Sequence, residues 1–309
     1  VLVTGGCGFI GSNLVEELIK RGIPTVVVDD LSSPREDIET KLENWEGKIE
    51  FINSCFSENK ILKRVKNRDF KAIFHLAAIP RVAYSVENPV ETSDVNVSRV
   101  VKLLTAVNDT GTRFIFSSSS SVYGGAEILP TPPDNPKLPK SPYAWQKSSI
   151  EELISVFVHL HGLDAVSLRY FNVFGPGQFG SSAYSTAIAA WCNAIKSGTV
   201  LRKDGSGDQS RDMCYVDNVV LANILAYSKE EKFIGQRYNV ACGDRVSNND
   251  ILNLFKEKFS NLKIRQAPFR SGDVMHTLAD ISATSADIGY KPKIKFWEGL
   301  ERTFEWWKI

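Results

Sequence analysis

The sequence predicts an α/β protein with a doubly wound parallel sheet and a smaller, mixed α/β C-terminal lobe. Short apolar runs alternate with amphipathic stretches through the first half of the chain, which is typical of successive βαβ units. These apolar runs are continuous, so we expect helices to cover both faces of the sheet. After about residue 172 the rhythm loosens, and glycine and proline interrupt the sequence.

The elements of the first half follow from these runs. Six runs predict strands at 1–4, 24–29, 49–52, 72–76, 112–117 and 164–169. Between the first two, residues 12–22 place Leu14, Leu18 and Ile19 on one helical face, and Gly22 ends the pattern. Longer helices are expected over 91–109 and 143–161.

The second half predicts a looser arrangement. Glycine-rich turns at 175–180 and 204–208 flank a predicted helix at 183–197. Residues 237–241 predict one more strand, and the last 70 residues predict two helices among proline-interrupted stretches. We therefore expect one domain over 1–172, with 211–242 returning to it, and a smaller lobe over 173–309.

Composition limits the possible partners. The chain has 309 residues, a net charge of +1, and 43% hydrophobic and 24% charged residues, as in ordinary globular proteins. Near-neutral charge argues against nucleic-acid binding, and the lack of a long apolar run argues against membrane insertion. Five cysteines stand singly, without metal-ligand spacing, so we expect free thiols, no metal, and a cytoplasmic location.

A glycine array directly follows the first strand. TGGCGFIGSNL carries Gly5, Gly8 and Gly11 at the start of a predicted helix. The first glycine permits a tight turn, the second lets backbone amides approach a pyrophosphate, and the third allows close helix–strand packing. The helix N-terminus adds partial positive charge, so this loop predicts a phosphate-binding site.

Two acids end the second predicted strand. Asp29 and Asp30 lie where a carboxylate can bind the ribose hydroxyls of an adenosine, 24 residues after Gly5 in the case of Asp29. Two negative charges would repel a 2′-phosphate, which favours NAD over NADP. Together with the glycine array, they predict a Rossmann-type dinucleotide-binding domain.

A serine run and a tyrosine–lysine pair predict acid–base chemistry. SSSSSVYG, at 117–124, follows an apolar strand, so its hydroxyls are expected at the carboxyl edge of the sheet. Tyr143 and Lys147 share a helical face, although such a pair is also common on helix surfaces. An ammonium lowers the pKa of a neighbouring phenol. A serine, tyrosine and lysine can thus take a proton from an alcohol while a hydride leaves to a nicotinamide.

These motifs keep the order found in a known family. TGGCGFIG, Asp29, HLAA at 75–78, SSSSSVYG and the Tyr143/Lys147 pair resemble an extended short-chain dehydrogenase/reductase over nearly the whole chain. RYFNVFGP, RDMCYVDNV and RSGDVMHTLADI resemble its nucleotide-sugar 4-epimerase branch, and the last two most resemble UDP-N-acetylglucosamine 4-epimerases.

The resemblance implies roles for particular residues. Tyr143 would be the base, with Lys147 tuning it and binding the nicotinamide ribose. Ser119 would contact the sugar oxygen, and Ser121 is a neighbouring candidate. The implied NAD site comprises Gly5, Gly8, Phe9, Ile10, Gly11, Asp29, Asp30, Leu76, Ala77, Ala78, Asn96, Tyr143, Lys147 and Phe171.

The resemblance also implies a nucleotide-sugar site formed by Ser119, Tyr143, Asn172, Arg211, Arg270, Asp273 and Thr277. Both arginines would contact the substrate diphosphate, which suits forked guanidinium donors. Asp273 would accept from the nucleoside ribose, and Asn172 would hold a phosphate or sugar oxygen. The family's acid near adenine is replaced by Cys55, which leaves adenine recognition open.

The reaction follows from what the serine run lacks. Dehydratases and decarboxylases of this family carry a carboxylate where this chain has Ser120 and Ser121, so reversible oxidation at C4 is favoured. Thr277 leaves room for an acetamido group, so UDP-Glc/UDP-Gal and UDP-GlcNAc/UDP-GalNAc are both expected substrates. UDP-glucuronate epimerisation, a dehydratase or decarboxylase, and a non-catalytic NAD sensor are the alternatives.

The predicted helices 91–109 and 143–161 also bear on assembly. They resemble those of the family's four-helix dimer interface, so a homodimer is expected. Packing within one chain accounts for their apolar faces equally well.

Overall fold

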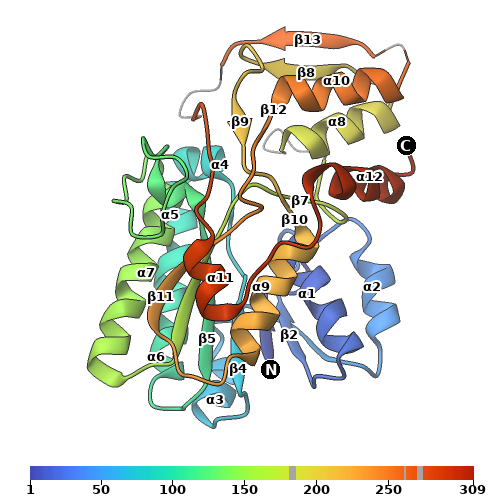
Figure 1. The fold of residues 1–309 in the computed structure, drawn as a ribbon. Coiled ribbons are helices and arrows are strands. Elements are labelled where there is room, and N and C mark those ends of the chain that lie inside the picture. Colours follow the sequence, from blue (N-terminus) through green and yellow to red (C-terminus); the bar gives the residue numbers. More distant parts are fainter. Residues whose placement is uncertain (181–185, 261, 270–273) are drawn as a thin grey trace.

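A seven-stranded parallel sheet forms the centre of the molecule. The computed structural model describes residues 1–180, 186–260, 262–269 and 274–309 (Figure 1). The strand order is β11-β6-β5-β4-β1-β2-β3, and the order reverses between β1 and β4, so the sheet is doubly wound as predicted. The strands are β1 (Leu2–Thr4), β2 (Val26–Asp29), β3 (Glu50–Asn53), β4 (Ala72–His75), β5 (Arg113–Ser119), β6 (Ala165–Tyr170) and β11 (Ile234–Val240).

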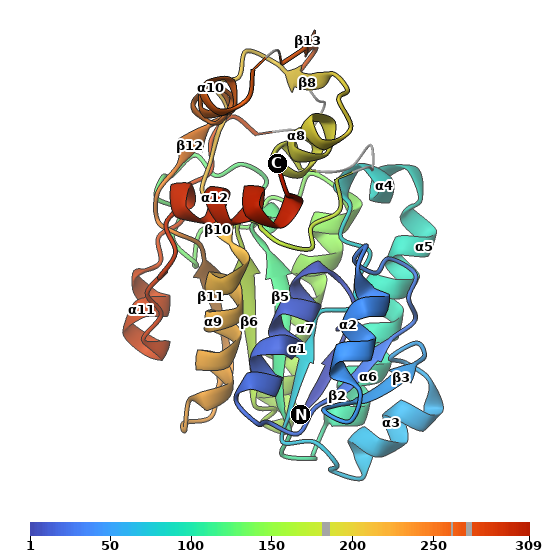
Figure 2. The ribbon, with the colours of Figure 1, turned by 90° about the vertical axis from the view of Figure 1, so that its right-hand side faces the viewer.

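Helices cover both faces of this sheet, as the continuous apolar strands predict. Neighbouring residues of β5 illustrate the division: Phe114 packs in the core on one face and Ile115 in the core on the other. Figure 2 shows α1, α2 and α9 on the near side of the sheet. The covering helices are α1 (Phe9–Lys20), α2 (Ile38–Trp45) and α9 (Val216–Ser228) on one face, and α3 (Asn59–Lys66), α6 (Arg99–Val107) and α7 (Pro142–His161) on the other.

The predicted helix over 91–109 begins earlier and changes its winding. It runs as α5 (Pro89–Ser93), a π-helical turn η1 (Asp94–Ser98) and then α6, after the short α4 (Val82–Glu87). π-turns often occur at functional sites, and this one carries Asn96. The short α2, α3 and α4 were not among the predicted elements.

The start of α7 follows from its sequence. Ser141 caps the helix, since its Oγ accepts the Ala144 amide at 3.2 Å, and Pro142 occupies the first turn, where its missing N–H costs nothing. Gly162, with a φ of 63°, ends the helix. These signals fix the positions of Tyr143 and Lys147 along the helix.

In the part of the second half that the structure describes, strands pair in three small sheets, which helices cover. The paired strands are β7 (Val173–Phe174) with β10 (Cys214–Tyr215), β9 (Ser210–Arg211) with β12 (Val246–Ser247), and β8 (Leu201–Asp204) with β13 (Ile264–Ala267). The helices are α8 (Ala187–Lys196), α10 (Asn248–Lys258), α11 (Ser282–Ile288) and α12 (Phe296–Trp307). Residues 183–185 of the predicted helix 183–197 lie outside the described residues.

The last 70 residues contain three described helices where the sequence predicted two. The additional one, α11, has seven residues and little apolar periodicity. It is held by tertiary contacts, such as the hydrogen bond from Thr284 Oγ1 to the Asn239 carbonyl at 2.8 Å. A periodicity search does not detect a helix of this kind.

The small sheets lie beyond one end of the main sheet. The N-terminus, where β1 begins, is at the opposite end (Figure 1), so the carboxyl ends of the parallel strands point toward the second half of the chain. The predicted strand at 237–241 is β11, which pairs with β6 in the main sheet. The division into domains at residue 172 remains a prediction. None of the helices in the described ranges combines the length and apolar character needed to cross a bilayer.

Candidate active site

The glycine array forms a closely packed turn at the carboxyl end of β1. Gly5 has a φ of +72°, and a Cβ there would lie 2.6 Å from the Ala77 nitrogen. A Cβ at Gly11 would lie 2.1 Å from the Gly5 carbonyl oxygen. Glycine is therefore required at both positions, because Gly5 packs against the segment that follows β4 and Gly11 packs against the backbone of Gly5.

The N-terminus of α1 is open to an anion. Gly8 caps this helix without any side-chain hydrogen bond, and Phe9, Ile10 and Gly11 form its first turn. First-turn amides have no partner within a helix, and they carry the positive end of the helix dipole. Such a turn has the chemistry that binds a phosphate group, and its role in holding the pyrophosphate remains a prediction.

The two acids after β2 differ in their contacts. The half-buried Asp29 carboxylate accepts the Cys7 amide and the Leu31 amide, both at 2.9 Å, and so joins the glycine turn to the loop after β2. The exposed Asp30 accepts the Ser32 amide at 3.1 Å. Burial raises the pKa of Asp29, and the two amides oppose that rise. Both carboxylates retain lone pairs that can accept ribose hydroxyls.

Asn96 holds the loop that follows β4. Its Oδ1 accepts the Ile79 amide at 2.8 Å, and its Nδ2 donates to the Ile79 carbonyl and to Gln146 Oε1. This buried amide thus positions the backbone after the predicted cofactor residues Leu76, Ala77 and Ala78.

Tyr143 and Lys147 are buried against the end of β5. Lys147 Nζ donates to the Ser117 carbonyl at 2.7 Å and lies 5.9 Å from the centroid of the Tyr143 ring. Burial raises the pKa of Tyr143 to about 12, although a hydrogen bond with Ser119 acts against the rise. Burial lowers the pKa of Lys147 to about 7.

The expectation that Lys147 lowers the pKa of Tyr143 is wrong for the ligand-free protein. Loss of solvent outweighs the neighbouring amine, because a buried phenolate and a buried ammonium are both costly.

The two candidate serines are placed differently. Ser119 lies close enough to Tyr143 to oppose the rise in its pKa, and Ser119 Oγ accepts the Ser121 amide at 3.2 Å. Ser121 Oγ is buried and has no hydrogen-bond partner among the described residues. The contact with the tyrosine favours Ser119, and Ser121 remains an orphaned polar group at the same strand end.

Asn172 and Thr277 meet in the second half of the site. Asn172 Nδ2 donates to the Asp212 carbonyl at 3.0 Å and to Thr277 Oγ1 at 3.1 Å, and the φ of Asn172 is +32°. Arg211 Nη1 donates to the carbonyls of Ser210 and Met275. These contacts bring together three of the predicted substrate residues.

Three predicted site residues remain to be located: Phe171, Arg270 and Asp273. Phe171 is buried beside Tyr123, with ring centroids 6.1 Å apart, in a small apolar cluster behind the site. Arg270 and Asp273 lie outside the described residues.

Two buried acids near the site were missed from the sequence. Glu151 follows Lys147 by four residues, so the spacing that joined Tyr143 to Lys147 could have identified it. Asp212 accepts the backbone amides of Cys242, Gly243 and Ala279, and a lone aspartate gives no sequence signal of this role.

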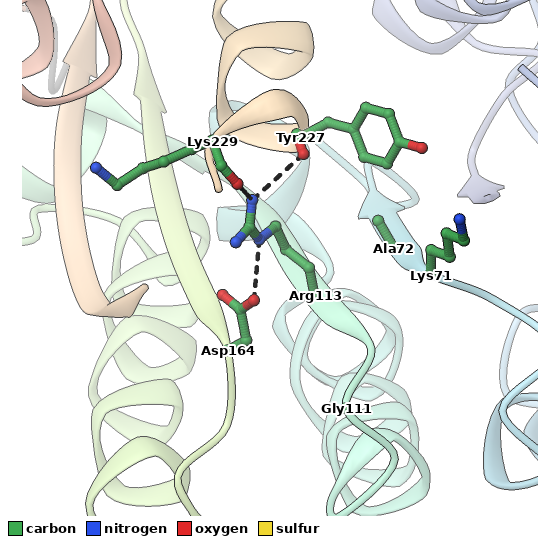
Figure 3. Close-up of a pocket in the computed structure, with 7 residues that line it drawn as sticks. All are labelled: Lys71, Ala72, Gly111, Arg113, Asp164, Tyr227 and Lys229. Carbon is green, nitrogen blue, oxygen red and sulfur yellow. Dashed lines mark hydrogen bonds and ion pairs between the residues drawn. The ribbon is translucent and has the colours of Figure 1, made fainter. Parts of the chain in front are cut away.

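A cavity of about 260 Å³ lies away from this site, at the amino edge of the sheet (Figure 3). At its centre Arg113 donates to the Asp164 carboxylate and to the carbonyls of Tyr227 and Lys229. Its guanidinium therefore neutralises the end of α9 and serves the fold. A second cavity, of about 340 Å³, lies nearer Thr277, between residues 125–129 with Lys140 and residues 274–276.

Comparison with known proteins identifies the family. The sequence model described as the NAD dependent epimerase/dehydratase family matches residues 1–241. The chain belongs to this family. The predicted cofactor, NAD, is the cofactor of the family, and the predicted relationship to nucleotide-sugar epimerases is confirmed.

Full-length relatives act on different UDP-sugars. The UDP-glucose 4-epimerase of Mycolicibacterium smegmatis is 32% identical, over 99% of this chain and 98% of that protein. The UDP-N-acetylglucosamine 4-epimerase of Methanobrevibacter ruminantium M1, solved with UDP-N-acetylmuramic acid, is 35% identical with a TM-score of 0.91, over 99% and 97% of the two chains. The UDP-glucuronic acid 4-epimerase of Bacillus cereus, solved with UDP-glucuronic acid and NAD, is 28% identical with a TM-score of 0.91, over 99% and 98%.

Proposed function

We propose that this protein epimerises a UDP-hexose at C4, with UDP-Glc/UDP-Gal and UDP-GlcNAc/UDP-GalNAc as the expected substrates. The observation that carries the proposal is the cluster of the buried Tyr143 and Lys147 with the partly buried Ser119 at the carboxyl end of β5. The absence of a carboxylate at Ser120 and Ser121 supports epimerisation over dehydration or decarboxylation.

The described residues fit NAD. The first turn of α1 would hold the pyrophosphate, Asp29 and Asp30 the adenosine ribose, and Lys147 the nicotinamide ribose. When bound, NAD supplies a reversible hydride acceptor and a positively charged ring. The backbone fixed by Asn96 would line the same site.

The chain's own residues would manage the proton. Tyr143 Oη takes the proton of the C4 hydroxyl as the keto sugar forms, and it returns the proton when the sugar is reduced on its other face. Ser119, which lies beside Tyr143, would hold the sugar oxygen. Because burial raises the pKa of Tyr143, the phenolate depends on positive charge from Lys147 and the bound cofactor.

The nucleotide would be held by the second half of the chain. Arg211 and Arg270 would bind the diphosphate, Asp273 the ribose, and Asn172 a phosphate or sugar oxygen. Thr277, whose hydroxyl faces Asn172, would border the hexose. Firm binding of the diphosphate leaves the hexose free to turn between the two reduction steps.

Separate incubation with UDP-Glc, UDP-GlcNAc and UDP-GlcA, followed by separation of the products, tests this proposal. We expect C4 epimers of the first two sugars and no loss of water or CO₂. Conversion of UDP-GlcA alone would replace the proposed substrate with the uronate. If none of the three sugars is converted, the epimerase proposal is wrong.

We further propose that the protein is a homodimer joined through α6 and α7. Val101, Trp145 and Val156 are 36%, 52% and 47% exposed on these helices, which supports burial against a second copy. Light scattering should give twice the chain mass for the wild type and a lower mass for Trp145→Glu. All five cysteines are free thiols, which supports a reducing location such as the cytoplasm.

A further inference from the structure

Three buried polar side chains form a stripe along α7. Tyr143, Lys147 and Glu151 are spaced by four residues and therefore share one face of the helix. They are 8%, 4% and 1% exposed. Buried ionisable groups require specific partners, so the third member of the stripe calls for an explanation.

The stripe faces the serine run residue by residue. Ser119 lies beside Tyr143 and acts to lower its pKa, and Lys147 donates to the Ser117 carbonyl at 2.7 Å. Glu151 Oε1 accepts from Ser118 Oγ, the residue between them, at 2.5 Å. Three successive positions at the end of β5 are thus attached to three successive turns of α7.

Glu151 is itself firmly held. Arg169 on β6 donates to both carboxylate oxygens, through Nε at 2.8 Å and Nη2 at 2.7 Å, and its side chain is 1% exposed. Lys137 and Arg237 approach Oε2 at 3.4 Å and 3.6 Å. These cations hold the pKa of Glu151 below its usual value, so the carboxylate stays charged.

Burial is the factor that disfavours the charge of Lys147. The ring of Phe116 on β5, with its centroid 4.8 Å from Nζ, favours the ammonium, and the amine in turn helps to lower the pKa of His75 on β4. Burial holds the pKa of His75 down at about 3, so that ring is neutral. From α7 itself, Tyr143 is neutral while the Glu151 carboxylate favours the protonated amine.

We propose that Glu151 is a positioning residue for the reaction: its carboxylate fixes Ser118, and with it the Ser117 carbonyl and Ser119 hydroxyl, against α7, and it keeps the Lys147 amine protonated. The inference rests on the proposed function for its kinetic consequences. The coupling between Glu151 and Lys147 is a property of the ligand-free chain, so it can be tested separately.

The first test compares Glu151→Gln with wild type and with Glu152→Gln. Glu152 is the neighbouring acid, its side chain is 58% exposed, and it also pairs with Lys137 and Arg237, so it is a matched control. The Lys147 ammonium is titrated in the ligand-free, full-length protein by NMR of ¹⁵N-labelled lysine side chains, assigned with Lys147→Arg. We expect the midpoint to fall by about one pH unit in Glu151→Gln, a tenfold loss of the charged form, and to stay in place in Glu152→Gln.

The same variants are then assayed for epimerisation across pH. In Glu151→Gln, kcat should fall about tenfold or more near neutral pH, with KM little changed, and the alkaline limb should move to lower pH. An equal titration of Lys147 in all three proteins would overturn the charge role. A fall in kcat without any change of the pH profile would reduce Glu151 to a structural residue.

Ser118→Ala tests the positioning role and leaves the Glu151–Arg169 pair intact, so it also serves if Glu151→Gln does not fold. We expect kcat to fall about tenfold while the Lys147 midpoint stays at its wild-type value. Wild-type kcat in Ser118→Ala would overturn the positioning role. If wild type converts no UDP-sugar, the proposed function fails, and the NMR titration still decides the coupling.

Discussion

The residues predicted to handle the proton stand on long, buried elements, whereas those predicted to hold the nucleotide sugar stand on two-residue strands and loops. Tyr143 and Lys147 lie on α7, which has 20 residues, and Ser119 ends β5, which has seven. Arg211 lies on a strand of two residues. Thr277 is held by backbone hydrogen bonds with a neighbouring segment.

The two groups of predicted site residues should therefore respond differently to substitution. A side chain on α7 is held by the helix and by its partners on β5, so replacing a reactive atom should leave the surroundings in place. In the nucleotide-sugar half, one hydroxyl or carboxylate joins several segments, as Asp212 does. Substitutions there should change binding and stability together.

The largest expected effect tests the proton-handling half. Tyr143→Phe removes the proposed base and leaves the ring in place, so kcat should fall by about 10²- to 10⁴-fold with little change in KM. Steady-state kinetics measures both constants. Tyr227→Phe, at the cavity on the opposite edge of the sheet, is the control and should behave as wild type. Full turnover by Tyr143→Phe would exclude this tyrosine as the base.

The cofactor turn should show the next largest effect. In Asp29→Asn, one carbonyl oxygen must replace two carboxylate oxygens that each accept a backbone amide, so the glycine turn loses a partner. We expect the Kd for NAD, measured by calorimetry on cofactor-free protein, to rise about 10- to 100-fold. Asp30→Asn should change it less than about threefold, because this acid is exposed. Equal effects would mean that Asp30 contributes as much to NAD binding as Asp29.

The sequence predicted the main sheet well because the signals for its strands and helices lie within short stretches of sequence. The apolar runs, the glycine array and the Ser141–Pro142 helix start are all local signals, and together they locate Tyr143 and Lys147 at one sheet edge. The strand at 112–117 continued to Ser119, so three serines of the run are strand residues and not a flexible linker.

The contacts of the second half could not be predicted from local patterns. Asn172 and Thr277 are 105 positions apart in the sequence, and no periodicity predicts the hydrogen bond that joins them. The effect of burial on the pKa values was also not predicted. Lys147 was expected to lower the pKa of Tyr143, but desolvation is the largest cause of the pKa shift of both groups. Resemblance to a family supplied residue roles there that local physics alone did not.

Asp212 should make the stability of the second half depend on pH. Burial raises its pKa to about 7 from an ordinary 3.8, against the lowering effect of three backbone amides. The folded protein therefore binds this proton more tightly than the unfolded chain does. The contribution of Asp212 to the free energy of unfolding is largest below about pH 4 and is lost as the pH rises through 7.

Asp212→Asn removes this titration. On going from pH 8 to pH 6, the unfolding free energy of wild type should rise by about 1 kcal/mol more than that of the variant, because the other titrating groups are shared. Urea denaturation at the two pH values measures the difference. Parallel pH dependence in the two proteins would mean that Asp212 does not titrate in this range.

The smallest effect is expected for Thr277→Val, which should change substrate binding and leave the chemical step unchanged. Thr277→Val keeps the shape of the side chain but removes the hydroxyl that accepts from Asn172 Nδ2 and from the Asp212 amide, each at 3.1 Å. A lost hydrogen bond of this kind costs about 1 kcal/mol, so KM for the UDP-sugar should rise about fivefold while kcat changes little. Thr199→Val, on an exposed turn after α8, is the matched control. This pattern is the reverse of that expected for Tyr143→Phe. A fall in kcat at constant KM would instead place Thr277 in the proton-handling half and remove the contrast between the two halves.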